Sequence, residues 1–170
     1  PNILHQGAIA SQYENIIPAN SNFYFGIEMN GTYRVAGNGY DYYEFGSADI
    51  YNWQYVSLVF HATGTVDTHI DGVSTGSSGL ILSSTVGSMP LEIGDMFTGG
   101  CSGCVEPFNG KLDNVQIWNS ALTQQEIEDN MNCYPNLDAN NLVGFWDFHY
   151  STNTFNDLSS QNNDGINLSL

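Results

Sequence analysis

The chain has 170 residues, about the length of one domain, and 41% of them are hydrophobic, which is enough for a buried core. Its 18 aspartates and glutamates face only 2 lysines and arginines, so the formal net charge is −16 and a phosphate backbone or an anionic lipid head would be repelled. These figures exclude nucleic-acid binding, and no apolar run is long enough to span a membrane.

The acidic excess has two interpretations, which are compatible with each other. Acidic secreted proteins use such a charge for solubility. Carboxylates also bind hard divalent cations, and calcium is the usual choice outside the cell. The sequence shows no signal peptide and opens at Pro1 in what reads as a strand region, so we expect a processed or excised part of a longer chain.

Apolar residues recur at every second position through much of the chain, as expected for half-buried β-strands. The first alternating run is residues 23–29, and Asn30-Gly31 directly after it is a hairpin-turn signal. Asp71-Gly72 is a second tight-turn signal. Further strand segments are expected at residues 33–35, 56–60, 66–70, 80–82, 91–93, 115–117 and 142–148. Many short strands between Gly, Asn, Asp and Ser clusters predict an all-β antiparallel sandwich.

One segment departs from this period and predicts a short helix over residues 123–131. Thr123 is a candidate N-cap, and Glu126 three residues later completes a capping box. Leu122 and Ile127 fit the hydrophobic staple around that cap.

The three cysteines are Cys101, Cys104 and Cys133. Too few ligands at suitable spacing accompany them for zinc, and no βαβ pattern surrounds them as in a thioredoxin-like site. We favour a disulfide between Cys101 and Cys104 that staples a loop, although Cys133 pairing with one of the two stays open. The four histidines, His5, His61, His69 and His149, share no short motif with one another or with a cysteine, so surface or strand-face positions are expected for them.

Residues 108–127 resemble the C-terminal signature of laminin-G-like domains, shared by pentraxins, which runs G-x-[IL]-D-x-[VI]-x-[IVL]-[WY]-x-x-x-L-[ST]-x-x-E-I. The matching residues are Gly110, Leu112, Asp113, Val115, Ile117, Trp118, Leu122, Thr123, Glu126 and Ile127. Residues 53–72 resemble the central hairpin of the family, and residues 91–94 the strand before the signature. The resemblance implies a concanavalin A-like jelly roll, of the kind found in large secreted bacterial surface proteins.

Residues 142–165 resemble the opening strand of the same family, L-V-G-Y-W-x-F…D-x-S-x-x-x-N-x-G, yet here they come last. The chain is either a circular permutation that closes its own sandwich or a cut across tandem repeats. We favour self-closure, because a lone Phe-Trp-Asp-Phe strand would expose a large apolar edge. The expected organisation is one sandwich over residues 1–170, with a main body at 1–132, a connector at 133–141 and closing strands at 142–170.

The resemblance also implies metal ligands. In jelly-roll relatives the acid of the signature strand coordinates a structural calcium ion, which points to Asp113, with Asp157 and oxygens near residues 163–165 completing the shell. Asp95 falls where pentraxin-like relatives place acids for a ligand-binding calcium. The alternatives are that Asp113 accepts hydrogen bonds in a turn and that Asp95 is a solvated loop acid.

Tyr40, Tyr42 and Tyr43 form the richest aromatic cluster and are the candidate ligand-binding residues. Tyrosine faces stack on sugar rings, and the neighbouring Asp41 and Glu44 could accept hydrogen bonds from sugar hydroxyls. Tyrosines are also ordinary strand residues that pair with neighbours across a sheet, which is the competing explanation.

Catalytic motifs are missing from the sequence. No segment has the E-x-D-x-x-E spacing of sandwich glycosidases, and there is no G-x-S-x-G, H-E-x-x-H or phosphate loop. We therefore predict a non-catalytic extracellular adhesion module that binds carbohydrate or glycoprotein with the help of calcium. The alternatives are a structural spacer repeat of a large secreted or cell-surface protein and an accessory domain of a polysaccharide-degrading enzyme.

Overall fold

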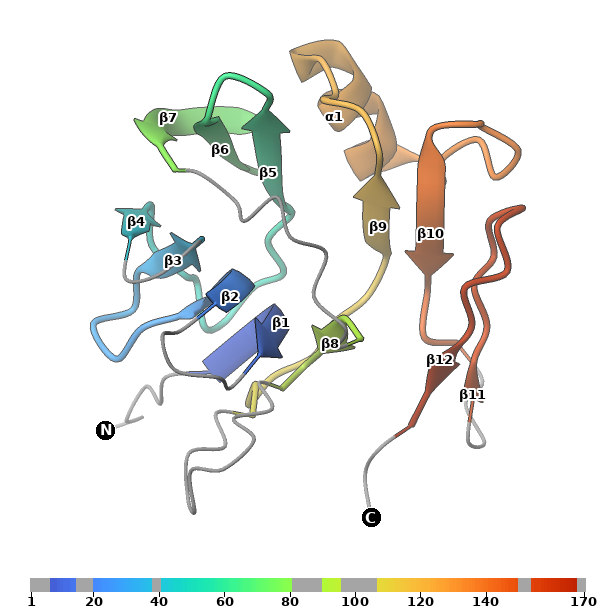
Figure 1. The fold of residues 1–170 in the computed structure, drawn as a ribbon, viewed down its shortest axis with the longest axis horizontal. Coiled ribbons are helices and arrows are strands. Elements are labelled where there is room, and N and C mark those ends of the chain that lie inside the picture. Colours follow the sequence, from blue (N-terminus) through green and yellow to red (C-terminus); the bar gives the residue numbers. More distant parts are fainter. Residues whose placement is uncertain are drawn as a thin grey trace. The chain divides into compact units, whose positions relative to one another are not determined.

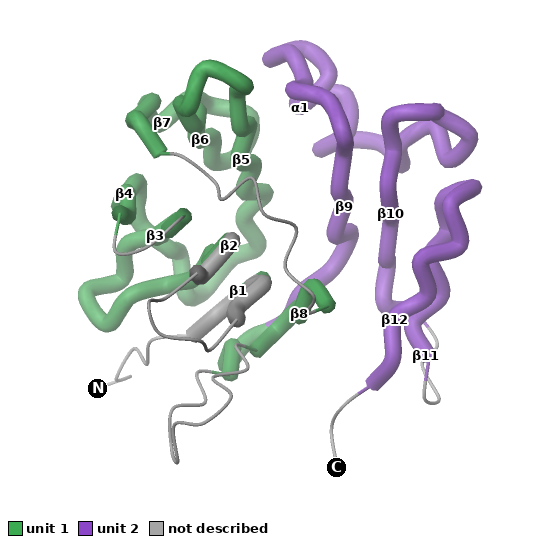
Figure 2. The backbone as a smooth tube through the Cα atoms, viewed as in Figure 1, with its two compact units in different colours: residues 1–110 green, residues 111–170 purple. Residues whose placement is uncertain are grey.

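The computed structural model divides the chain into two compact units, residues 1–110 and residues 111–170 (Figure 2). Each unit is described by itself. The residues that the structure describes are 7–14, 20–37, 41–80, 90–95, 107–149 and 154–167.

The first unit contains a five-stranded antiparallel sheet. Its strands are β1 (Gly7–Glu14), β2 (Asn20–Ile27), β3 (Tyr33–Ala36), β4 (Tyr42–Phe45) and β8 (Glu92–Ile93). They lie in the order β4-β3-β2-β1-β8. The turn from β2 to β3 contains the predicted Asn30-Gly31 pair, and Gly31 has a φ of 83°, which a glycine adopts without steric penalty.

A second sheet of the same unit consists of β5 (Val56–His61), β6 (Thr65–Ile70) and β7 (Val73–Gly79), paired in that order. Asp71 and Gly72 form the two-residue turn between β6 and β7, with φ values of 51° and 76° that fit the primed turns typical of hairpins. The sequence did not predict β7, because its Ser, Thr and Gly residues are mostly exposed and show no apolar alternation.

Side chains from both sheets form the core of the first unit. Val35 of β3 and Val66 of β6 are completely buried and belong to one apolar cluster with Phe25. The rings of Phe23 and Phe60 meet edge to face, with centroids 5.9 Å apart, across the two sheets. The two sheets therefore pack as the predicted β-sandwich (Figure 1).

The second unit contains β9 (Val115–Trp118), α1 (Gln124–Asn132), β10 (Leu142–Trp146), β11 (Thr154–Phe155) and β12 (Gly165–Ile166). α1 confirms the predicted short helix, and Thr123 and Glu126 form the expected reciprocal capping box. α1 is too short to cross a membrane, and no other helix within the described ranges could do so either.

The tail of the chain pairs with the family-signature strand. β10 lies antiparallel to β9, with Leu142 opposite Trp118 and Trp146 opposite Val115. Leu142 and Phe145 are completely buried. A side chain at Gly144 would overlap the indole of Trp146, so the Gly-Phe-Trp order lets that ring fold across its own strand. The division into a main body at 1–132, a connector at 133–141 and closing strands at 142–170 stays a prediction.

Candidate functional site

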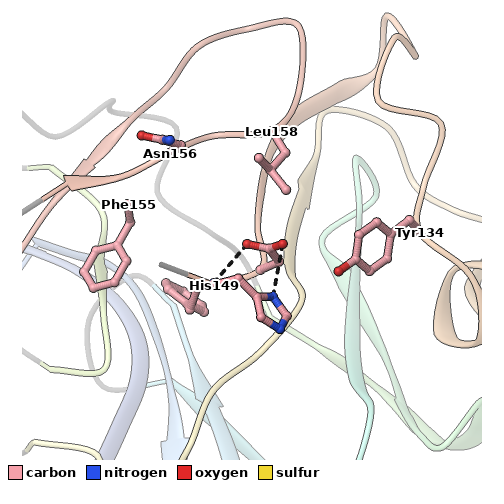
Figure 3. A pocket seen from close by; sticks show the side chains of 7 residues that line it. Tyr134, His149, Phe155, Asn156 and Leu158 are labelled. Atoms are coloured by element: carbon pink, nitrogen blue, oxygen red, sulfur yellow. Dashed lines mark hydrogen bonds and ion pairs between the residues drawn. The ribbon is translucent and has the colours of Figure 1, made fainter. Parts of the chain in front are cut away.

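The second unit contains a cleft of about 460 Å³, within the ~300–1,000 Å³ range typical of small-molecule sites. Three segments of the unit supply its walls: the connector before β10, the segment that leaves β10, and β11 with the residues after it. Figure 3 shows Tyr134 and Phe155 on opposite sides of the cleft. The lining residues are Tyr134, Asp147, Phe148, His149, Phe155, Asn156 and Leu158.

Aromatic rings form much of the wall. The rings of Phe148 and Phe155 meet edge to face with centroids 5.3 Å apart. Tyr134 stands edge-on against the buried Phe145 at 5.1 Å and is still 56% exposed. Phe148 has a φ of 51°, an unfavourable conformation for a bulky L-residue. Such backbone strain is concentrated at ligand sites in proteins, so its position at this cleft is an independent indication of function.

A hydrogen-bonded carboxylate lies among these rings. Oδ1 of Asp147 accepts the backbone N–H of His149 at 3.1 Å, and Oδ2 lies 3.1 Å from Nδ1 of the same histidine (Figure 3). The Asp147 side chain is 18% exposed, whereas that of His149 is 56% exposed. The carboxylate is therefore oriented by its neighbour, and a ligand in the cleft can still reach it.

The hydroxyl of Tyr134 belongs to the same polar group. Partial desolvation raises the pKa of Tyr134, and the charges of Asp147 and Asp113 and a hydrogen bond with Asp147 raise it further. The phenol therefore stays protonated at neutral pH and acts as a donor toward Asp147. Asp113, the acid that the family resemblance singled out, lies near enough to this cleft to influence it electrostatically.

Asp157 is placed by hydrogen bonds rather than by an open coordination site. The residue is 7% exposed, and its carboxylate accepts the backbone N–H groups of Phe145, Ser159 and Asn163 at 2.8–2.9 Å. The Ser159 hydroxyl donates a fourth bond at 2.8 Å. A carboxylate has about four lone-pair sites, so all of them are used. A cation at Asp157 would have to displace one of these donors.

These bonds also explain the tail motif. Burial raises the pKa of the Asp157 carboxyl, but the hydrogen bonds from Phe145, Asn163 and Ser159 outweigh burial and hold the pKa below its usual range. The Asn163 amide donates to the carbonyl of Val143 at 2.7 Å, and the Asn163 carbonyl accepts the Trp146 indole N–H at 3.2 Å. The D-x-S-x-x-x-N pattern therefore ties the last loop to β10.

The other predicted metal ligands lie elsewhere in the fold. Asp113 is exposed, and its Oδ1 accepts the backbone N–H of Asn114 at 2.8 Å. Asp95 follows β8 in the first unit and is partly buried. Within the described ranges, no three acid, histidine or cysteine side chains lie together so that they could hold a metal ion. The calcium site stays a prediction, and the cleft described above does not depend on it.

The predicted tyrosine platform divides between the two faces of β4. Tyr42 is 57% exposed, and the guanidinium of Arg34 lies 4.2 Å from its ring centroid. Arg34 also forms ion pairs with Glu28 at 3.1 Å and Glu44 at 2.7 Å. Tyr43 packs against the apolar core instead. Tyr40 lies outside the described residues, so only Tyr42 presents an open ring, and its binding role stays a prediction.

The cysteine predictions remain without a test. Cys101 and Cys104 lie outside the described residues. Cys133 is exposed, has a free thiol and forms the C-cap of α1.

Sequence reasoning did not identify the cleft. Its residues come from segments that are separate in the chain, and no spacing rule connects Tyr134 with Asp147 or Phe155. The available signal was local: the run Asp147-Phe148-His149 places an acid, an aromatic ring and an imidazole directly after a buried strand. His149 is 56% exposed, as expected of a surface residue, and it also orients Asp147, which no sequence motif indicates.

Comparison with known proteins places the chain in a family. A family model described as the concanavalin A-like lectin/glucanases superfamily matches residues 5–128. A search of curated proteins found no match. The crystal structure of a candidate carbohydrate-binding protein from Bacteroides ovatus ATCC 8483 is similar to 98% of this chain, with a TM-score of 0.72 and 20% sequence identity. This chain spans only 48% of that protein.

A second solved structure is much less similar. It is an S-layer domain-containing protein from Clostridium thermocellum ATCC 27405, with 20% identity, coverage of 76% of this chain and 64% of that chain, and a TM-score of 0.38, which is too low to support an argument. The B. ovatus structure supports the same sandwich fold over nearly the whole chain, and the family model covers most of it. The chain belongs to the concanavalin A-like lectin/glucanases superfamily.

Proposed function

We propose that the chain is a carbohydrate-binding module and that the cleft around Asp147 is its sugar site. The observation that carries this proposal is the arrangement of the Tyr134, Phe148 and Phe155 rings around an accessible, oriented carboxylate. The family and the similarity to the B. ovatus protein support the same class of ligand.

The cleft offers groups that suit both the apolar faces and the hydroxyl groups of a sugar. The C–H faces of a pyranose ring are apolar and stack on aromatic side chains, and its hydroxyls need hydrogen-bond partners when they leave water. Asp147 supplies acceptor oxygens, and the amide of Asn156 supplies both a donor and an acceptor. Sites of this kind bind through a mostly apolar wall and a few placed polar groups.

The negative charge of the chain favours neutral glycans over acidic ones as ligands. The chain carries a net charge of −16, and Asp147 and Asp113 add negative potential at the cleft itself. A uronic acid or sulfated glycan would be repelled, whereas a neutral sugar would bind without that penalty.

Binding without catalysis is the accompanying proposal. Glycoside hydrolysis requires a pair of carboxylates across the scissile bond, and Asp147 is the single acid among the described residues that line the cleft. In the first unit, Ser77 and His61 both hydrogen-bond to Asp67. A nucleophilic serine would need to hydrogen-bond to the imidazole itself as its general base, whereas Ser77 hydrogen-bonds to Asp67. Ser77, His61 and Asp67 therefore do not form a serine–histidine catalytic arrangement. We propose that the module acts outside the cell within a longer protein.

A glycan array with the labelled chain, followed by calorimetry on the best neutral oligosaccharide, tests the proposal. Tyr134→Ala removes one wall of the cleft and is expected to weaken binding at least about tenfold. Tyr42→Ala is the matched control, because the two tyrosines are 56% and 57% exposed. Loss of binding in Tyr42→Ala with full binding in Tyr134→Ala would move the site to β4 and overturn the proposal.

A further inference from the structure

The segment that joins β4 to β5, residues 46–55, holds three large apolar side chains in solvent. Tyr51 is 81% exposed, Trp53 is 65% exposed and Ile50 is 47% exposed. A single exposed apolar residue needs no explanation, but three within four positions of one loop form a patch of the kind that marks a contact surface. None of these residues belongs to the cleft proposed above.

Both ends of this loop are fixed to neighbouring turns. The backbone N–H of Ala48 donates to the carbonyl of Gly31, in the β2–β3 turn, at 2.8 Å. At the other end, the backbone N–H of Tyr55 donates to the Asp71 carboxylate at 2.8 Å, and the Asp71 backbone N–H donates to the Tyr55 carbonyl at 2.7 Å.

The centre of the loop is fixed as well. The carboxylate of Asp49 accepts the backbone N–H of Tyr51 at 2.9 Å and the side-chain amide of Asn52 at 2.8 Å, and both bonds lower the pKa of Asp49. The carbonyl oxygen of the Gln54 side chain accepts the backbone N–H of Asp49 and the hydroxyl of Tyr33. The exposed rings are therefore held on an ordered backbone, and a partner would not bear the entropy of ordering the loop.

We propose that the Tyr51–Trp53 loop is a second glycan-contacting surface, one that binds neutral polysaccharide chains separately from the cleft. This inference rests on the proposed function only for the class of ligand, neutral glycans.

The size of the patch favours a glycan chain over a protein partner. A tyrosine or tryptophan side chain presents roughly 150–250 Å² when fully exposed, so Tyr51 and Trp53 at their exposed fractions, together with the half-exposed Ile50, offer about 400 Å². A stable protein–protein interface needs about 800 Å² on each side. Contact with one or two sugar rings fits the smaller area.

The charge of the loop leads to the same class of ligand. Asp49 is the single ionisable acid within residues 46–55, and hydrogen bonds already use both of its oxygens. The loop contains no lysine or arginine. Its exposed surface therefore consists of rings, amides and backbone groups, which suit a neutral, hydroxyl-rich polymer.

An open surface of this kind binds each sugar weakly, so its contribution is expected with polymers rather than with short oligosaccharides. A polymer presents many identical sugar units along one chain, so a surface that binds each unit weakly meets a high local concentration of them. The loop therefore increases the apparent affinity for a polysaccharide while leaving the affinity of the cleft for a short fragment unchanged.

Affinity electrophoresis of the full chain tests this, in gels that contain a neutral β-glucan, a xylan or a galactomannan. The variants are Trp53→Ala, the double variant Tyr51→Ala/Trp53→Ala and Trp53→Phe, which keeps a ring. Val73→Ala is the matched control, since Val73 is 67% exposed on β7 of the same unit. Calorimetry with the oligosaccharide selected on the array measures the cleft in parallel.

The expected result is a loss of polymer retardation of about tenfold or more in the double variant, partial recovery in Trp53→Phe, and unchanged oligosaccharide affinity in all of them. Full retardation of the double variant would overturn the proposal, as would the failure of every polymer to retard the parent chain. If Tyr134→Ala keeps full retardation while the loop variants lose it, the cleft assignment fails and the loop stands. A Trp53-dependent dimer in sedimentation, with no change in glycan binding, would assign the loop to protein contact instead.

Discussion

Replacing Asp157 by alanine tests most directly how the tail of the chain is held. The substitution removes four hydrogen-bond acceptor contacts at once. Three of the donors belong to Phe145, which is completely buried, and Ser159, which is 5% exposed. Water cannot readily replace the carboxylate at those donors. An unsatisfied buried donor costs about 1–3 kcal/mol, so the expected loss of unfolding free energy is about 3–5 kcal/mol.

Urea unfolding with linear extrapolation measures this loss. Asp164→Ala is the control, because its carboxylate lies in the same loop, is exposed and accepts one bond, from the Asp157 backbone at 2.9 Å. That control should lose no more than about 1 kcal/mol. If Asp157→Ala does not fold, Ser159→Ala removes one donor and should lose about 1 kcal/mol.

The same titrations, in excess EDTA and in millimolar calcium, separate hydrogen bonding from metal binding. Because four donors saturate the carboxylate, the loss in Asp157→Ala should be equal in the two buffers. A loss below about 1 kcal/mol would refute the hydrogen-bond argument. A loss that appears only in calcium would assign Asp157 to the predicted metal shell.

Three further predictions concern local features of the second unit. Thr123→Ala removes the side chain that caps α1 through Glu126, and should lower the unfolding free energy by about 1 kcal/mol, with Thr123→Ser retaining most of it; equal stability of the two would contradict the cap. Gly144→Ala forces a side chain into the Trp146 indole and should cost about 1–3 kcal/mol and alter the near-ultraviolet circular dichroism, so an unchanged spectrum would rule out the overlap. Hydrogen bonds hold the pKa of Asp157 below its unfolded value of about 3.9, so its contribution to stability is present above that pH and is lost as the pH falls through the folded pKa. Urea midpoints measured between about pH 2 and 6 should therefore fall less steeply with decreasing pH in Asp157→Asn than in the parent chain. Parallel curves for the two proteins would contradict this role of Asp157.

Strands could be predicted where apolar side chains alternate with polar ones, and the helix could be predicted from its capping-box motif. Phe25 and Val66 belong to the apolar core, and the alternating positions Phe23, Ile27 and Ile70 pack against it, whereas Met29 lies beyond the end of β2 and is 72% exposed. The capping box at Thr123 depends only on residues three positions apart. β7 has no such signal, because an exposed Ser, Thr and Gly strand is held by its backbone ladder to β6 rather than by apolar side chains.

The candidate site could not be predicted in the same way. The cleft joins Tyr134, Asp147 and Phe155 across a fold whose turns determine which side chains meet, and short-range spacing carries none of that information. Asp157 shows a second limit. A carboxylate that coordinates calcium and one that accepts four hydrogen bonds have the same place in a D-x-S-x-x-x-N motif, and only the positions of the donors distinguish them.

A titration of the ¹⁵N-labelled chain with its best neutral oligosaccharide tests whether the cleft binds glycans. We expect the largest amide shifts at Tyr134, at Asp147–His149 and at Phe155–Leu158, with saturation at a single affinity. Shifts confined to Tyr42 and its neighbours on β4, or no saturable shifts with any neutral glycan, would contradict it.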